Sequence, residues 1–160
     1  PSQSSAASDV YKRQQFEDGE FNQLTYWMSR QIIDNYPLDL ISPVDWMDES
    51  QDLNERVRSY LDVNCGHCHS PTGNANSTGL YLHLNETRDV NLGVYKKPVA
   101  TGRGSGGLKY SIVPGKPEES ILLHRMISMD PGVMMPESGR ALTHEEAVEM
   151  VREWIMFMEK

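Results

Sequence analysis

Cys65 and Cys68 are the only cysteines of this 160-residue chain, and they stand three positions apart with His69 directly after the second. A disulfide between residues so close would close a very short loop, which constrains little of the unfolded chain. The pair therefore does not act as a cross-link that holds the fold together. We expect both thiols to serve chemistry instead.

The stretch Cys65-Gly66-His67-Cys68-His69 has the spacing C-x-x-C-H, the pattern of covalent haem attachment. Two thiols separated by two residues can reach the two vinyl groups on one edge of a porphyrin and form thioethers. The adjacent histidine is then held beneath the iron, where its imidazole becomes the proximal ligand. The motif predicts one covalently bound haem c, with an iron held by His69.

Three other interpretations of the motif stay open. Its four Cys and His residues could ligate zinc, although a structural zinc site usually draws a second pair of ligands from elsewhere, and neither His83 nor His124 is in a paired spacing. A thioredoxin-like redox pair needs a βαβ context, which this sequence does not supply. The third alternative is two buried thiols beside an unrelated histidine.

A methionine that ligates the iron from the opposite side would suit electron transfer. The chain has nine methionines, most of which we expect to fill the core. Met135 is the predicted distal ligand, because it lies in a loop between the last two predicted helices and Pro136 stiffens that loop. The alternative distal ligands are Met134, Met126, Met129, His83, His124 and His144.

Hydrophobic spacing predicts a first helix over residues 15 to 34 and a second over residues 48 to 63. Asp48 or Ser50 is the expected N-cap of the second helix, which leads directly into the cysteine motif.

A third helix is predicted to begin at Pro117 and to end before Asp130. The last helix begins at a predicted capping box, Thr143 with Glu146. Its apolar residues repeat every three or four positions and predict a buried stripe of Ala147, Val148, Val151, Trp154, Ile155 and Met158.

Residues 70 to 116 hold most of the glycines and predict a long, loop-rich insert. Residues 79 to 84 and 110 to 113 are compatible with short strands, and the glycine-rich part at 96 to 111 has no motif that assigns it a role. The predicted fold class is all-α, a small helical fold wrapped around one haem.

The net charge of −8 argues against nucleic-acid binding, because phosphate recognition requires a basic face. It also argues against binding to anionic membrane surfaces, and no run approaches the roughly 18 apolar residues that cross a bilayer. Hydrophobic residues make up 38% of the chain, so the core is thin and a large apolar cofactor would help to fill it.

From about residue 48 to 160 the chain resembles a bacterial class I c-type cytochrome domain. It is especially similar to the C-terminal haem domains of larger secreted bacterial proteins. The stretches that carry the resemblance are 58 to 69, Ile112-Val113-Pro114-Gly115, Ser120-Ile121-Leu122, Arg125-Met126, Met134-Met135-Pro136 and Trp154-Ile155.

The resemblance implies one-electron transfer by a mono-haem carrier in the periplasm or outside the bacterial cell, with a transient redox partner protein. Cys65 and Cys68 would anchor the haem, His69 and Met135 would ligate the iron, Pro114 and Gly115 would line its proximal side, and Arg125 would face a propionate. We also expect the carbonyl oxygen of Pro114 to accept a hydrogen bond from the ring of His69. The alternative functions are an electron-delivering module of a larger oxidoreductase or peroxidase, and a non-haem metal-binding structural module.

Three segments are expected along the chain. Residues 1 to 14 are interpreted as a non-native or linker segment, because the stretch ending at Gln14 resembles a translated sequencing-adapter end and follows a Ser- and Ala-rich tail. Residues 15 to 45 are interpreted as the tail of an upstream domain of the same polypeptide or an N-terminal extension. Residues 46 to 160 are the predicted cytochrome domain.

Overall fold

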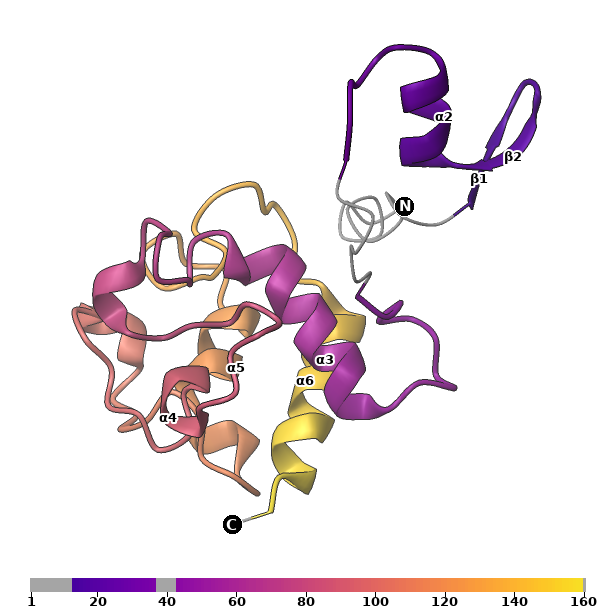
Figure 1. Cartoon of the computed structure of the whole chain (residues 1–160). Helices are drawn as coiled ribbons and strands as arrows, with labels where there is room; N and C mark the ends of the chain where they lie inside the picture. Colours follow the sequence, from indigo (N-terminus) through magenta and orange to yellow (C-terminus); the bar gives the residue numbers. More distant parts are fainter. Residues whose placement is uncertain (1–12, 37–42, 160) are drawn as a thin grey trace.

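The computed structural model describes residues 13–36 and 43–159 (Figure 1). Its strands and α-helices, in chain order, are β1 (Arg13–Phe16), β2 (Gly19–Asn22), α2 (Gln23–Ser29), α3 (Leu53–Leu61), α4 (Asp89–Leu92), α5 (Ile121–Ile127) and α6 (Glu145–Phe157). Short 3₁₀ turns lie at Asn76–Thr78, Gly102–Ser105 and Pro117–Glu119, and a π-helical turn lies at Asp62–Gly66.

The prediction of an all-α fold is wrong, because the described residues combine α-helices with a two-stranded antiparallel sheet. β1 pairs with β2 so that Phe16 lies opposite Gly19. Gly19 has a φ of +131°, a backbone conformation that side chains with a Cβ rarely adopt. The chain therefore reverses at Glu17-Asp18, directly before Gly19, inside the range that hydrophobic spacing predicted as helix.

The predicted helix over 15 to 34 is confirmed only for α2. Asn22 caps this helix, since its Oδ1 accepts a hydrogen bond from the backbone nitrogen of Thr25 at 3.1 Å. The ring of Phe16 on β1 stacks on Tyr26 of α2 with centroids 3.9 Å apart. Local packing between hairpin and helix thus replaces the long helix. Of the predicted first segment, 1 to 14, residues 1 to 12 lie outside the described residues, and Arg13 and Gln14 belong to β1.

The core of the remaining residues forms where α6 packs against α3 and α5 (Figure 1). The predicted stripe on α6 is confirmed for its first five members, which are buried, whereas Met158 is partly exposed. The most completely buried large side chains are Leu61, Leu82, Ile112, Leu123, Ile155, Val57 and Val151. No helix in the described ranges is both long and apolar enough to pass through a bilayer.

The predicted caps of α3 and α6 are wrong. Asp52, not Asp48 or Ser50, caps α3, because its Oδ1 accepts from the backbone nitrogens of the next turn at 2.9 and 3.2 Å. α6 begins after His144 without a side-chain cap. The Thr143 hydroxyl instead donates to the carbonyl oxygen of Ile127 at 3.4 Å, which ties the start of α6 to the end of α5.

The insert from 70 to 116 is loop-rich as predicted, and at 110 to 113 it contributes isolated bridges rather than a strand: Val94 to Ile112 and Tyr110 to Ser120. Its glycines have a packing role. A Cβ on Gly104 would lie 3.2 Å from the guanidinium carbon of Arg125, and one on Gly106 would lie 2.5 Å from the ring of His124. The glycine-rich loop therefore lies close against the side chains of α5.

Candidate cofactor site

The cysteine motif follows α3 through the π-helical turn and continues as one helical turn. The backbone nitrogens of Cys68 and His69 both donate to the carbonyl oxygen of Cys65, at 3.1 and 2.8 Å. Residues three and four positions apart lie on the same face of such a turn. The structure thus brings Cys65, Cys68 and His69 onto one face, while His67 between them is exposed.

Both thiols are free and partly buried. Cys65 packs against the apolar core. Burial, with a smaller contribution from neighbouring Cys68, raises the pKa of the Cys65 thiol to about 12. Cys65 is therefore protonated at neutral pH, and the two thiols are not joined to each other.

His69 is held through its backbone, since its carbonyl oxygen accepts from the nitrogen of Leu82 at 2.8 Å. Its Nδ1 is buried and has no hydrogen-bond partner, so the predicted bond to the carbonyl oxygen of Pro114 is not formed. Burial lowers the pKa of His69, and the backbone of Leu80 opposes that shift. The neutral imidazole, which is the form that ligates metal, is thus favoured.

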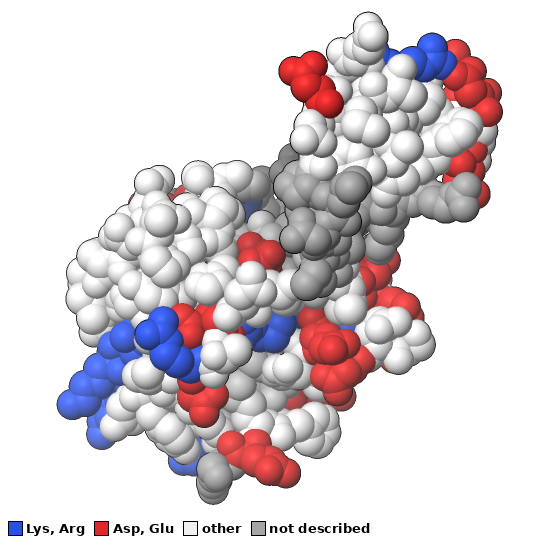
Figure 2. Space-filling view, in the orientation of Figure 1, with Lys and Arg blue, Asp and Glu red and all other residues white. Residues whose placement is uncertain are grey.

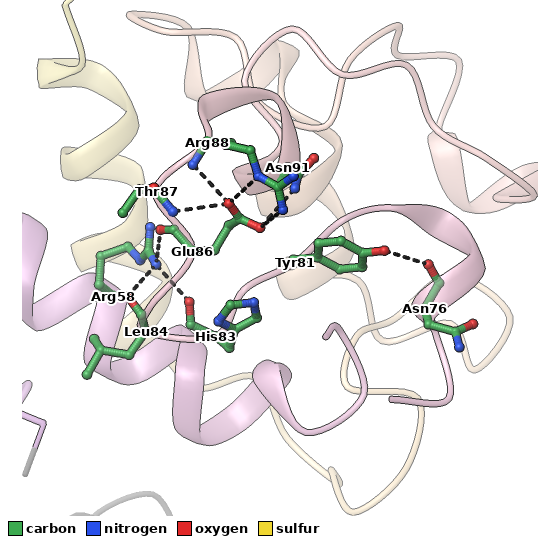
Figure 3. A network of polar contacts seen from close by, with 9 residues as sticks. All are labelled: Arg58, Asn76, Tyr81, His83, Leu84, Glu86, Thr87, Arg88 and Asn91. Atoms are coloured by element: carbon green, nitrogen blue, oxygen red, sulfur yellow. Dashed lines mark hydrogen bonds and ion pairs between the residues drawn. The ribbon is translucent and has the colours of Figure 1, made fainter. Parts of the chain in front are cut away.

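Residues 83 to 86, which lie beside the motif, are fixed by Arg58, a buried residue of α3 (Figure 3). One guanidinium nitrogen, Nη2, donates to the carbonyl oxygens of His83, Leu84 and Glu86 at 2.8, 2.9 and 2.8 Å. Burial lowers the pKa of Arg58, although the carboxylates of Asp62 and Glu86 oppose this. Sequence spacing does not reveal this residue, because its acceptors are backbone atoms 25 to 28 positions away.

The buried carboxylate of Glu86 gathers the next part of the insert (Figure 3). It accepts from the backbone nitrogens of Thr87 and Arg88, from the guanidinium of Arg88 and from the side-chain amide of Asn91. The hydrogen bonds from Arg88 and then Asn91 hold the pKa of this carboxyl well below its usual range. Arg58 therefore holds the insert at residues 83 to 86, and Glu86 holds it at residues 87 to 91.

Two glycines allow this close approach. A Cβ on Gly66 would lie 3.3 Å from the Cα of His83, and a Cβ on Gly73 would overlap the carbonyl group of Cys68. The same carbonyl oxygen accepts from the backbone nitrogen of Ala75 at 3.0 Å. The chain after the motif consequently folds back tightly on Cys68.

The predicted distal ligand, Met135, is partly buried in the loop between α5 and α6. Its backbone nitrogen donates to the carbonyl oxygen of Arg125 at 3.0 Å, and its carbonyl oxygen accepts from Arg140 at 2.9 Å. Among the alternatives, Met126 is 6% exposed within the core, and Met129 is 50% exposed at the surface. Met134 shares the partly buried position of Met135.

Two residues in or next to the cysteine motif also have neighbours in or next to this loop. Tyr60 interacts electrostatically with both Cys65 and Arg140. His69 likewise interacts with Arg125, whose carbonyl group holds Met135. The loop between α5 and α6 that holds Met134 and Met135, the methionine loop, therefore lies near the motif.

The other predicted site residues are Pro114 and Gly115, which form a turn, and Arg125, which hydrogen-bonds to the backbone of the following loop. Pro114 and Gly115 occupy the centre of a turn closed by a 2.9 Å bond from the nitrogen of Lys116 to the carbonyl oxygen of Val113, with a φ of +75° at Gly115. Arg125 donates through Nε to the carbonyl oxygen of Val133 at 2.8 Å. The turn is anchored to α6 rather than to His69, since the nitrogen of Gly115 donates to Ile155.

His144, one of the alternative distal ligands, packs between Trp46 and Tyr60, with ring centroids 5.0 and 5.5 Å away. Sequence analysis missed this aromatic cluster, and it also missed Arg140. Tyr60 could have pointed to the cluster, because it lies on the helix that leads into the motif.

Charge is unevenly distributed over the chain. Residues 88–116 contain six Lys and Arg residues and one acidic residue, Asp89, although the net charge of the whole chain is −8. In the view of Figure 2, Lys and Arg gather at the lower left of the molecule and Asp and Glu dominate its right side. The insert is therefore a basic part of an acidic protein.

The donor set fits covalently attached haem: two free thiols and an imidazole share one face of a turn, and a nitrogen of that imidazole is buried without a partner. Across residues 13–36 and 43–159, no three His, Cys, Asp or Glu side chains cluster as a metal site, so the zinc interpretation gains no support. No protein-family model, curated protein or solved structure matches this chain.

Proposed function

We propose that this chain is a c-type cytochrome domain that carries one covalently attached haem c and transfers single electrons. The observation that carries this proposal is the single helical turn that presents Cys65, Cys68 and His69 on one face, with both thiols free. A haem bound there would supply an iron that takes up and gives off one electron.

In this proposal each residue of the motif has a distinct role. Cys65 and Cys68 would hold the haem through two thioethers, formed as each thiol S–H adds across a vinyl group. His69 provides the proximal nitrogen ligand, and its lowered pKa keeps the ring in the neutral form that can ligate iron. The hydrogen bond from the nitrogen of Leu82 to the carbonyl oxygen of His69 fixes the backbone that carries this imidazole.

Met135 would be the second protein ligand of the iron. Arg140 and Arg125, which both bind the backbone of Met135, lie near Tyr60 and His69 respectively. A thioether ligand raises the reduction potential and closes the coordination sphere, which suits an electron carrier better than a catalyst. The proposed location of such a carrier is the periplasm or the cell exterior. Its redox partner would be a protein that binds transiently.

The test is expression of the full chain behind a secretion signal in a bacterial host that is competent for c-type haem maturation. We expect the denatured protein to keep one haem, seen as added mass and as a pyridine haemochrome spectrum. Cys65→Ser and Cys68→Ser should each lose one thioether, and the double variant should lose covalent haem altogether. His67→Ala changes an exposed histidine of the same motif and should load normally. A wild-type protein that matures without added mass would contradict the proposal.

The spectrum of the loaded protein separates a carrier from an enzyme. A low-spin spectrum with the ferric absorption band of a methionine sulfur ligand supports the carrier. A high-spin spectrum indicates an open coordination position, as a haem enzyme needs for its substrate.

A further inference from the structure

Arg140 lies in the methionine loop and donates hydrogen bonds to backbone carbonyl groups of the loop and of the end of α5. Its Nη1 donates to the carbonyl oxygens of Met126 at 2.5 Å and Met135 at 2.9 Å, and its Nη2 donates to that of Ser128. One planar guanidinium thus joins the loop to the C-terminal end of α5.

The environment of Arg140 is suited to this task. The side chain is partly buried, and within the described ranges it forms no ion pair with a carboxylate. Burial lowers the pKa of this guanidinium, and Tyr60 opposes the shift. Its positive charge is compensated by the carbonyl oxygens at the end of α5, which carry the negative end of the helix dipole.

Met135 is held on both sides of its Cα as a result. The carbonyl oxygen of Arg125 accepts from its nitrogen at 3.0 Å, and Arg140 donates to its carbonyl oxygen. Two fixed peptide groups hold the Cα of Met135 in place, so its thioether side chain extends from a fixed point of the loop. Without Arg140 the backbone of Met135 keeps, among the described residues, the bond to Arg125, and the carbonyl oxygens of Met126 and Ser128 lose the same donor.

We propose that Arg140 is the positioning residue that holds Met135 for axial ligation. This inference rests on the proposed haem c function. A lysine is a poor replacement, because its single ammonium group lacks the planar fork that reaches acceptors on both sides. Arg140 does not touch the iron in this proposal; it acts through the backbone of Met135.

The experiment uses the haem-loaded full chain and compares Arg140→Gln with Arg152→Gln. Arg152 is a matched control, because it is an arginine on α6 that pairs with Glu149 and Glu118, away from the loop. Haem content, measured by mass and haemochrome, should be the same in the wild type and both variants. Only Arg140→Gln should weaken the ferric methionine–iron band.

Added imidazole gives the second readout, because it competes with the sulfur for the iron. Its affinity should rise by roughly tenfold or more in Arg140→Gln and stay unchanged in Arg152→Gln, since the apparent affinity follows the fraction of open sites. Met135→Ala sets the upper limit. If Arg140→Gln does not fold, Arg140→Lys takes its place, with an expected affinity between those of the wild type and Met135→Ala.

The outcomes are distinct. Haem-loaded Arg140 variants with a wild-type band and wild-type imidazole affinity would overturn the role of Arg140 and leave the haem proposal intact. A loaded wild type without the methionine band would also overturn it, because Met135 would then not be the ligand. Absence of haem from the wild type would overturn the proposed function itself.

Discussion

The hydroxyl oxygen of Tyr60 lies 3.1 Å from Nδ1 of His144, although 84 positions separate the two residues in the sequence. Trp46 covers the same imidazole edge-on at 5.0 Å. The contact joins α3, which leads into the cysteine motif, to the first residue before α6. It therefore couples the orientation of the motif to the packing of the two longest helices of the core.

Replacement of Tyr60 by Phe tests this coupling. Burial is the main reason that the pKa of Tyr60 is raised above its ordinary value of 10.0. The folded state therefore favours the protonated phenol, and this stabilisation is complete below pH 10.0 and is lost as the pH rises above it. Tyr60→Phe should lower the free energy of unfolding by about 1 kcal/mol at neutral pH through the lost hydrogen bond.

The variant should also lose less stability than the wild type in alkaline solution. Urea unfolding at neutral pH and above pH 10.0 measures both effects. Tyr81→Phe is the control, because the Tyr81 hydroxyl makes only a long 3.4 Å contact to a backbone carbonyl oxygen. Equal alkaline losses in the wild type and Tyr60→Phe would count against a buried phenol.

Arg58→Met should destabilise the domain, because three backbone carbonyl oxygens lose their shared donor. A buried acceptor left without a partner costs about 1 to 3 kcal/mol, so we expect a loss of about 2 kcal/mol in the free energy of unfolding. Arg103→Met removes an exposed arginine paired with Asp130 and should change stability by less than about 0.5 kcal/mol. Denaturant unfolding of both variants provides the comparison, and similar small losses would contradict the role given to Arg58.

Glu86 makes the stability of the insert depend on acid. Its pKa lies below the ordinary value of 4.5, chiefly through the hydrogen bonds from Arg88, so the stabilisation is present above pH 4.5 and is lost as the pH falls below it. Glu86→Gln should be less stable than the wild type at neutral pH, and the difference should shrink in acid. Thermal unfolding from neutral to acidic pH reads this out. A constant difference across that range would show that the charge of Glu86 is unimportant.

Gly73→Ala should disturb the chain directly after the motif. A methyl group there would overlap the backbone of Cys68, which cannot move without displacing the thiol. We expect a loss of more than about 2 kcal/mol in stability, together with a lower yield of covalent haem, because the strain is borne by backbone. Gly139→Ala meets no atom within 4 Å and has only the strain of its φ of +76°, about 1 kcal/mol. Normal haem loading of Gly73→Ala would show that the turn tolerates displacement.

Local features were the most predictable from sequence. The three-residue spacing of Cys65 and Cys68 and the adjacent His69 place all three on one helical face wherever the turn lies in the fold. The apolar repeat of α6 likewise predicted its buried face, because helical geometry relates residues only a few positions apart. α5 lies between Pro117 and Asp130 as predicted, but it begins at Ile121 rather than at Pro117, because Pro117–Glu119 form a separate 3₁₀ turn and Ser120 is extended.

Caps and turns were less predictable, since several residues nearby could serve equally well. Asp52 caps α3 although Asp48 and Ser50 are also suitable, because α3 begins later than its apolar pattern suggests. The reversal at Gly19 shortened the first predicted helix, and the sheet it creates overturned the expected fold class.

The sequence by itself therefore determined the groups on which the proposed cofactor chemistry depends, namely two thiols and an imidazole on one turn. The tertiary structure decided what holds them: Arg58 fixes the segment beside the motif, and Arg140 fixes Met135. Both arginines bind backbone carbonyl groups, which every residue carries and no sequence pattern distinguishes. Only the folded path of the chain selects which carbonyl groups come within reach of each guanidinium.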